Sequence, residues 1–212
     1  MTKQPRQEGQ VRRGRVSSNR GVQVVALVHG TLNQHAIWYR PGGPLYEYLA
    51  KEVFPNDVLI SVEWSGKIGP VALRNGARKL IHAVRNQEEQ GKIRKLRIVC
   101  HSNGANVTNL ATYDNILPND PGLEFYTIVY LAPHARRESL PDIDRIISRR
   151  VFVFRPKVID EVLDPLQLPK DYRSTSLGKI QTERFTGPFG HWSPTTPYFW
   201  QQGGFSELIN NA

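Results

Sequence analysis

The sequence predicts a three-layer α/β sandwich with about six mostly parallel strands. From Val22 onward, short apolar runs alternate with segments of helical periodicity, which is the pattern of an α/β protein. The first apolar runs are nearly continuous, as in strands that are buried on both faces of a parallel sheet. The length of 212 residues suits one compact domain of about 100 to 200 residues or slightly more. We therefore expect a single domain over residues 21–212.

The strands are predicted from their apolar runs. The first run, Val24–Val28, lies between Gly21 and Gly30, and five further strands are expected at Val58–Val62, Leu96–Cys100, Phe125–Leu131, Val151–Phe154 and Ile180–Phe185. Parallel strands need crossover connections, which are right-handed and place helices on both faces of the sheet.

The connecting helices follow from apolar residues at helical spacing. A short helix is expected over Leu45–Val53, before Pro55, and the longest helix contains Leu73, Ala77, Leu80, Ile81 and Val84, with Gly91 as its C-cap. A third helix is expected from Ala105 to about Ile116, and a short helix closes the chain.

The formal charge of +9 is concentrated at one end of the chain. Residues 1–20 hold six basic residues against Glu8 alone, so this segment carries more than half of the excess. With almost no apolar content it is predicted to be a flexible basic arm. No aromatic residue lies among its arginines to stack on bases, so we expect no specific nucleic-acid partner.

Other classes of protein are unsupported by the composition. The single cysteine, Cys100, excludes an intramolecular disulfide and disfavours a cysteine-based metal site. The six histidines lack metal-binding spacing, and no glycine-rich phosphate loop follows the first strand, so we expect neither a metal nor a cofactor. There is no run of about 18 apolar residues and no apolar leader, so we expect a cytoplasmic protein without a membrane span.

A serine lies at the sharp turn between the third strand and its helix. Ser102 is flanked two positions away by the small residues Cys100 and Gly104. This segment resembles the nucleophile elbow, Gly-x-Ser-x-Gly, of the α/β-hydrolase family, with Cys100 in place of the first glycine. The resemblance implies the α/β-hydrolase fold and Ser102 as the nucleophile. Cys100 would lie within the strand, so we interpret it as a buried thiol.

The same resemblance implies the partners of Ser102. The family order is serine, acid, histidine, and His191 is the one histidine after residue 134, so it is the expected base. The acid of the family follows a buried strand, here Val151–Phe154. Asp160 is the first candidate, Asp164 before Pro165 is its rival, and Glu161 is the third.

Two backbone amides are expected to stabilise the oxyanion. One is that of Asn103, which follows the nucleophile. The second is expected in the His29-Gly30-Thr31-Leu32 segment, which resembles the His-Gly motif of the family, with Thr31 or Leu32 as the donor. His29 and His101 are expected to have supporting roles.

The interval between the fourth and fifth predicted strands leaves no room for the lid domain that many members of the family carry. Residues 132–150 must also hold a connecting helix, so an open site is expected. Aromatic loop residues are candidates for binding the substrate, although each could equally be packed in the core: Trp38, Tyr39, Trp64, Trp192 and Tyr198.

The sequence therefore predicts a serine hydrolase that cleaves small carboxylic esters through an acyl-enzyme intermediate. The alternative is a catalytically silent scaffold of the same fold that binds a partner through its basic surface. The natural substrate and the oligomeric state do not follow from the sequence.

Overall fold

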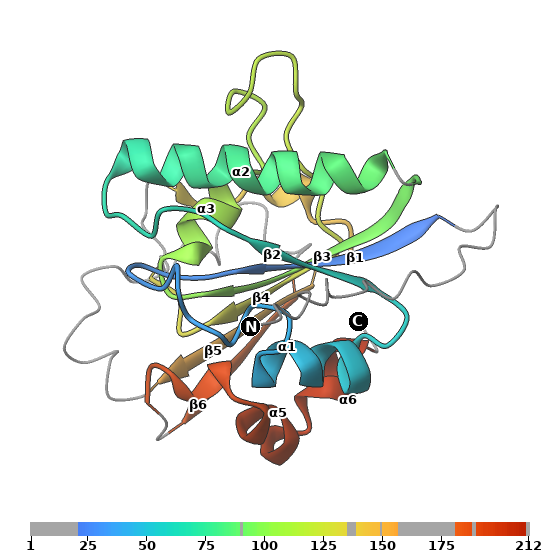
Figure 1. Ribbon diagram of the computed structural model, residues 1–212, viewed down its shortest axis with the longest axis vertical. Coiled ribbons are helices and arrows are strands. Elements are labelled where there is room, and N and C mark those ends of the chain that lie inside the picture. The colour runs from blue at the N-terminus through green and yellow to red at the C-terminus, as the bar shows by residue number, and fades with distance from the viewer. Residues whose placement is uncertain are drawn as a thin grey trace, which may run out of the picture.

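The computed structural model describes residues 21–89, 91–134, 139–148, 150–156, 181–187 and 190–210 (Figure 1). The predicted arm at residues 1–20 lies outside this range. So do Asp160, Glu161 and Asp164, the three candidates for the acid.

A six-stranded sheet with the order β2-β1-β3-β4-β5-β6 forms the middle layer. All neighbouring strands are parallel, so the predicted sheet is confirmed. The strands are β1 (Val22–Val28), β2 (Val58–Val62), β3 (Ile93–His101), β4 (Thr127–Leu131), β5 (Arg150–Pro156) and β6 (Gln181–Gly187).

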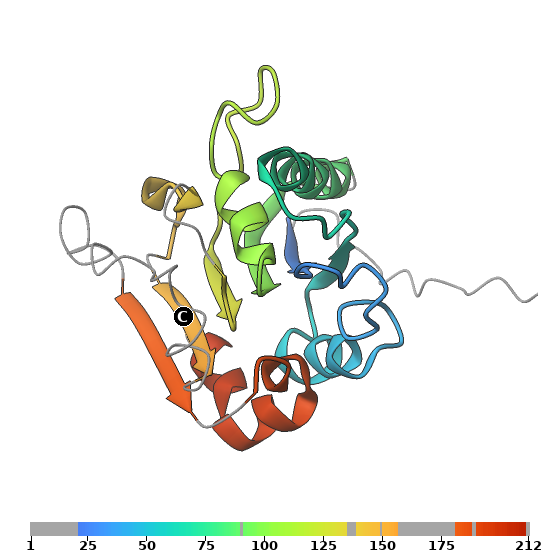
Figure 2. The same ribbon diagram turned by 90° about the vertical axis from the view of Figure 1, so that its left-hand side faces the viewer.

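Helices cover both faces of this sheet (Figures 1 and 2). One face carries α2 (Pro70–Glu88) and α3 (Gly104–Leu110); the other carries α1 (Pro44–Tyr48) with its π-helical continuation η1 (Leu49–Val53), α5 (Pro197–Gly203) and α6 (Phe205–Asn210). Two short 3₁₀ turns are η3 (Ile143–Arg145) and η6 (Ser193–Thr195). Among the described helices, none has both the length and the apolar character needed to cross a bilayer.

The two faces of the sheet bury separate apolar cores. In β1, Val24 and Val28 pack under α2 and α3, whereas Val25 and Leu27 pack with Leu45 of α1. Alternate side chains of a strand point to opposite faces, so a strand that feeds two cores must be apolar at every position. This explains why the run at Val24–Val28 has no polar residue.

Several predicted boundaries were wrong: β3 begins at Ile93 and not Leu96, and the C-cap of α2 is Glu89 and not Gly91. The helix after Ser102 ends at Leu110 and not near Ile116, because Thr112 donates its hydroxyl proton to the carbonyl of Asn109 at 2.6 Å and its amide bonds the same oxygen. That carbonyl would otherwise accept from the next helical turn. Phe125 lies outside β4 and forms an isolated bridge with Ile146.

The start of α3 lies unusually close to the end of β1. A Cβ atom on Gly104 would lie 2.6 Å from the carbonyl oxygen of His29 and 2.7 Å from that of Val28. Both obstacles are backbone atoms in or next to the sheet, so neither can move aside cheaply. Gly104 is therefore required by packing.

Replacing Gly104 by alanine is expected to lower the free energy of unfolding by about 2–3 kcal/mol through overpacking. Urea unfolding measures this change. The matched control is Gly190→Ala, whose Cβ would meet only the Ser193 hydroxyl at 3.7 Å and should cost much less. Equal losses in the two variants would contradict the packing argument.

Candidate active site

The candidate site lies where the chain order of the sheet reverses. β2 lies on one side of β1 and β3 on the other, and ligands of open parallel sheets bind beyond the carboxyl ends of the strands at such a point. Val28, at the end of β1, is in register with Cys100 of β3. Gly30 and Ser102 are therefore brought together as the two strands end.

The backbone of Ser102 has a left-handed conformation, with φ of 53°. Such an angle is uncommon for a residue with a side chain and costs of order 1–3 kcal/mol. Three backbone hydrogen bonds hold it: the Ser102 amide donates to Leu131 at 2.9 Å, and the Ser102 carbonyl accepts from Ala105 and His134, both at 3.1 Å. The turn between β3 and α3 is thus fixed to the end of β4.

Gly30 leaves room for the Ser102 side chain. A Cβ at position 30 would lie 2.6 Å from the Ser102 Cβ and 3.2 Å from its Oγ. The hydroxyl is largely enclosed, since Ser102 is only 5% exposed. Any residue other than glycine at position 30 would push against this hydroxyl.

The thiol of Cys100 is unsuited to be a nucleophile. Its side chain is fully buried within β3, and burial raises the pKa of the thiol to about 12. The reactive form of cysteine is the thiolate. The interpretation of Cys100 as a buried core thiol agrees with this environment.

Three histidines gather beside Ser102. The ring of His191 lies 4.6 Å from the ring of His101 and 5.1 Å from that of His134. His101 donates its Nε2 proton to the carbonyl of His191 at 3.0 Å, an assignment that follows because a carbonyl can only accept. His134 in turn donates its amide to Ser102. His191 and Ser102 are thus held through common neighbours, although no direct hydrogen bond joins these two described residues.

Burial keeps the central histidines neutral. Burial lowers the pKa of His191 to about 4, with a smaller contribution from His134. Burial also lowers the pKa of His101 to about 3, with His191 as the next cause. Nδ1 of His191 is enclosed and has no hydrogen-bond partner among the described residues. At neutral pH His191 therefore has an uncharged ring whose buried nitrogen needs a partner.

The arrangement of the histidines differs from that of metal-binding clusters over the described residues. Across the described ranges, no group of three or more His, Cys, Asp or Glu side chains is arranged to hold a metal ion.

The expected oxyanion donors differ in whether their amides already donate a hydrogen bond to the backbone. The Leu32 amide donates to the carbonyl of Gly66 at 3.0 Å, so it is already engaged. The amides of Thr31 and Asn103 have no backbone acceptor within the described part of the chain. The Asn103 side chain donates to Thr31 Oγ1 at 2.9 Å, which joins the two residues directly.

Most of the aromatic candidates are core residues. Trp38, Tyr39 and Trp64 are 6%, 0% and 2% exposed, so they offer almost no surface to a ligand, contrary to the expectation for Trp38 and Tyr39. Tyr39 packs on the ring of His29 at 4.8 Å. Trp192 is 52% exposed and its ring lies 4.8 Å from His101. Trp192 is thus an aromatic surface of the site, and Tyr198 is also exposed.

His134 and Asn106 also contact the site, although the sequence predicts no role for them. Asn106 is fully buried and donates to the His134 carbonyl at 2.6 Å. The signal for His134 was its place just after a buried strand, where ligands gather. Asn106 gave a weaker signal, because it is one of several polar residues in α3.

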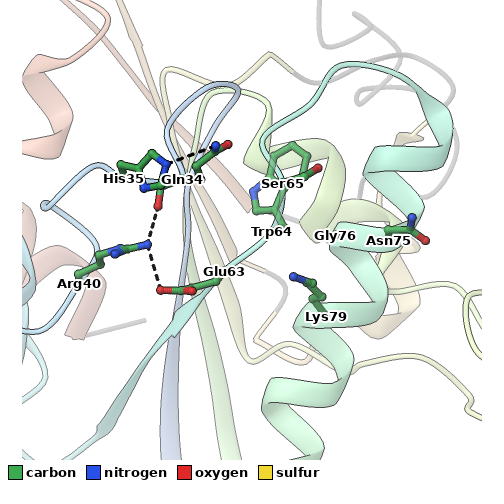
Figure 3. Close-up of a pocket in the computed structure, with 9 residues that line it drawn as sticks. All are labelled: Gln34, His35, Arg40, Glu63, Trp64, Ser65, Asn75, Gly76 and Lys79. Carbon is green, nitrogen blue, oxygen red and sulfur yellow. Dashed lines mark hydrogen bonds and ion pairs between the residues drawn. The ribbon is translucent and has the colours of Figure 1, made fainter.

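A cleft of about 380 Å³ lies between the segment after β1, the end of β2 and α2 (Figure 3). In it, Nη2 of Arg40 bonds Glu63 at 3.0 Å and the Gln34 carbonyl at 2.5 Å. Lys79 of α2 faces this pair across the cleft (Figure 3). None of the predicted catalytic residues lines the cleft, so it is distinct from the surroundings of Ser102.

The buried state of His101 predicts an acid-sensitive fold. Its pKa is about 3 when folded and near 6.5 in an unfolded chain. Between these values the unfolded chain binds a proton that the folded chain does not, so stability falls as the pH drops. From pH 7.5 to 5 this group should cost about 2 kcal/mol.

The variant His101→Gln keeps a donor for the His191 carbonyl and removes the titration. Its free energy of unfolding, measured in urea at pH 7.5 and 5, should therefore fall by about 2 kcal/mol less than that of wild type. The same fall in both proteins would contradict the assignment of a buried neutral imidazole.

No protein-family model matches the sequence, and no curated protein matches it either. Several solved structures have folds similar to that of this chain. One is a protein of unknown function from Agrobacterium tumefaciens, with 18% identity and a TM-score of 0.58 over 89% of this chain and 91% of that chain.

Two further neighbours have described activities. One of two esterases from Rhizomucor miehei has 13% identity and a TM-score of 0.55 over 94% of this chain and 77% of its own. The NocB thioesterase domain, solved as a covalent complex with a fluorophosphonate analogue, has 13% identity and a TM-score of 0.53 over 92% and 96%. Identities this low establish the fold and not the activity. The protein has the α/β-hydrolase fold.

Proposed function

We propose that the protein is a serine hydrolase that cleaves small carboxylic esters through an acyl-enzyme intermediate. The observation that supports this proposal most directly is the position of the Ser102 side chain. Its side chain projects from a left-handed turn, beside a glycine that leaves it room and next to a group of buried neutral histidines. Activated serines need a neutral base nearby.

In the first half of the reaction, Ser102 Oγ attacks the ester carbonyl carbon and its proton passes to Nε2 of His191. Collapse of the tetrahedral intermediate expels the alcohol, which takes that proton, and leaves the acyl group on Ser102. Water then attacks the acyl-enzyme and gives one proton to His191. His191 returns that proton to Ser102 Oγ as the bond to the acyl group breaks and the carboxylic acid leaves. The absence of a direct bond between the two side chains is compatible with this, because such bonds often tighten only when substrate binds.

A carboxylate is proposed to bind Nδ1 of His191. This nitrogen is enclosed and lacks a partner among the described residues, and a triad acid would fix its tautomer and stabilise the imidazolium. Asp160 is the proposed acid, with Asp164 and Glu161 as its rivals. All three follow Pro156, where β5 ends, and β5 runs parallel to β4 beside the site.

The amides of Asn103 and Thr31 are the proposed oxyanion donors. Thr31 is preferred to Leu32 because the Leu32 amide already binds Gly66. Removal of one such donor typically costs about 3 kcal/mol of transition-state stabilisation. The exposed indole of Trp192 would offer an apolar surface to the acyl or alcohol group, which favours small, apolar esters.

Replacing Ser102 by alanine is expected to lower kcat for p-nitrophenyl acetate or butyrate by about 10⁴-fold or more and to abolish labelling by a fluorophosphonate. The matched control is Ser148→Ala, since among the described residues the Ser148 hydroxyl accepts from the Arg150 amide at 3.2 Å, at the start of β5. It should keep the wild-type rate. Full turnover in Ser102→Ala would disprove the assigned nucleophile, and an inert wild type would favour the silent scaffold.

Replacing Asp160 by asparagine is expected to lower kcat by about 10⁴-fold, because an amide cannot stabilise the imidazolium and favours the wrong tautomer. Asp164→Asn serves as the matched control and should have a far smaller effect on ester turnover. The opposite ranking would make Asp164 the acid, and a large loss only in Glu161→Gln would assign the role to Glu161.

A further inference from the structure

A chain of buried amides runs from the site along α3. Asn103, Asn106 and Asn109 recur at every third position and are 7%, 0% and 0% exposed. A buried amide is costly unless its hydrogen bonds are made. Asn106 donates to Asn103, and Ser139 joins Asn106 to Asn109, so the three amides form one network.

The direction of every bond at the site end of this network is determined. The carbonyl of His134 can only accept, so the atom of Asn106 that lies 2.6 Å from it must be Nδ2. The same Nδ2 donates to Asn103 Oδ1 at 2.5 Å. The Asn103 amide is thereby oriented with its own Nδ2 toward Thr31 Oγ1, at 2.9 Å.

The remaining acceptor of Asn106 is also used. Its Oδ1 accepts from the Ser139 hydroxyl, so both protons of Nδ2 and the carbonyl oxygen have partners. A side chain that is buried and bonded in this way has a single orientation available. Asn106 can therefore transmit a fixed geometry to its neighbours.

One branch of the network joins the two proposed oxyanion donors. The side chain of Asn103 holds the hydroxyl of Thr31, while the next amide, Leu32, is anchored to Gly66. These two bonds restrain the segment just after the Thr31 amide, at the Thr31 side chain and at the next backbone amide. The separation of the Thr31 and Asn103 amides depends on this side-chain bond.

The other branch reaches the histidines. The carbonyl of His134 accepts a hydrogen bond from Asn106, and its amide donates to Ser102. The ring of His134 lies 5.1 Å from that of His191. One buried amide therefore connects the oxyanion side of the site with the turn of Ser102 and the surroundings of the base.

We propose that Asn106, acting through Asn103 and Thr31, is a positioning residue that sets the oxyanion hole relative to Ser102. This role rests on the proposed serine-hydrolase function. Asn106 touches no reacting atom. Because oxyanion donors must lie about 2.7–3.1 Å from the oxyanion, loosening this network should slow the chemical steps and leave ground-state binding nearly intact.

Two variants test the network at different points. Thr31→Val keeps the shape of the side chain and removes the acceptor of Asn103, and Thr31→Ser restores that acceptor. Asn106→Asp keeps the shape but places carboxylate oxygens against the His134 carbonyl and Asn103 Oδ1. The matched control is Thr127→Val, which removes a 2.7 Å bond from Thr127 to the Arg150 carbonyl at the opposite end of β4.

The readouts are kcat and KM for p-nitrophenyl butyrate and the second-order rate of fluorophosphonate labelling, on full-length protein. We expect Thr31→Val and Asn106→Asp to lower kcat and the labelling rate by about 10-fold or more, with KM within about 2-fold. Thr31→Ser should recover most of the lost rate. Thr127→Val should lose stability and keep its kcat.

Two results would overturn the role, and they are distinguishable. If wild type turns over and is labelled at Ser102 while both variants keep its kcat, or raise KM alone, Asn106 is only structural. An equal loss of kcat in Thr127→Val would likewise show that Asn106 is only structural. If wild type shows neither turnover nor labelling, the serine-hydrolase function fails and the positioning role fails with it.

Discussion

The close packing of the Ser102 turn against the ends of β1 and β4 is the constraint on which the rest of the site depends. The turn fits only because positions 30 and 104 lack side chains. Its left-handed backbone costs about 1–3 kcal/mol, which the bonds to Leu131, Ala105 and His134 offset. The parallel pairing of β1, β3 and β4 fixes where those partners lie. The strain at Ser102 is thus supported by the centre of the sheet.

The same packing determines the electrostatics around Ser102. It encloses His101 and His191, and this burial lowers the pKa of each imidazole well below neutrality. A neutral ring can accept a proton from a serine, whereas a protonated ring cannot. A carboxylate on the enclosed Nδ1 of His191 would oppose part of this shift, because a nearby negative charge favours the protonated form. Burial and the proposed acid therefore act on the base in opposite directions.

The sequence predicted what is determined locally or by periodicity. The apolar run of β1 and the serine between a strand and a helix were read correctly, because alternation and turn chemistry leave a local pattern. Contacts between distant segments leave none. The burial of Tyr39 and the engagement of Leu32 by Gly66 each depend on such contacts. Asn106 was missed for the same reason, since its partners His134 and Ser139 are about thirty residues away. The choice among Asp160, Asp164 and Glu161 remains a prediction.

The central claim is that Ser102 is a nucleophile activated by its surroundings. The measurement that tests it most directly is peptide mass mapping of the wild-type protein after treatment with a fluorophosphonate at pH 7.5. The claim predicts a single phosphonyl adduct on Ser102, formed quickly when folded and not in urea, because only the folded site supplies a base and oxyanion donors. An adduct on another residue, or equal labelling of the folded and unfolded chains, would contradict it.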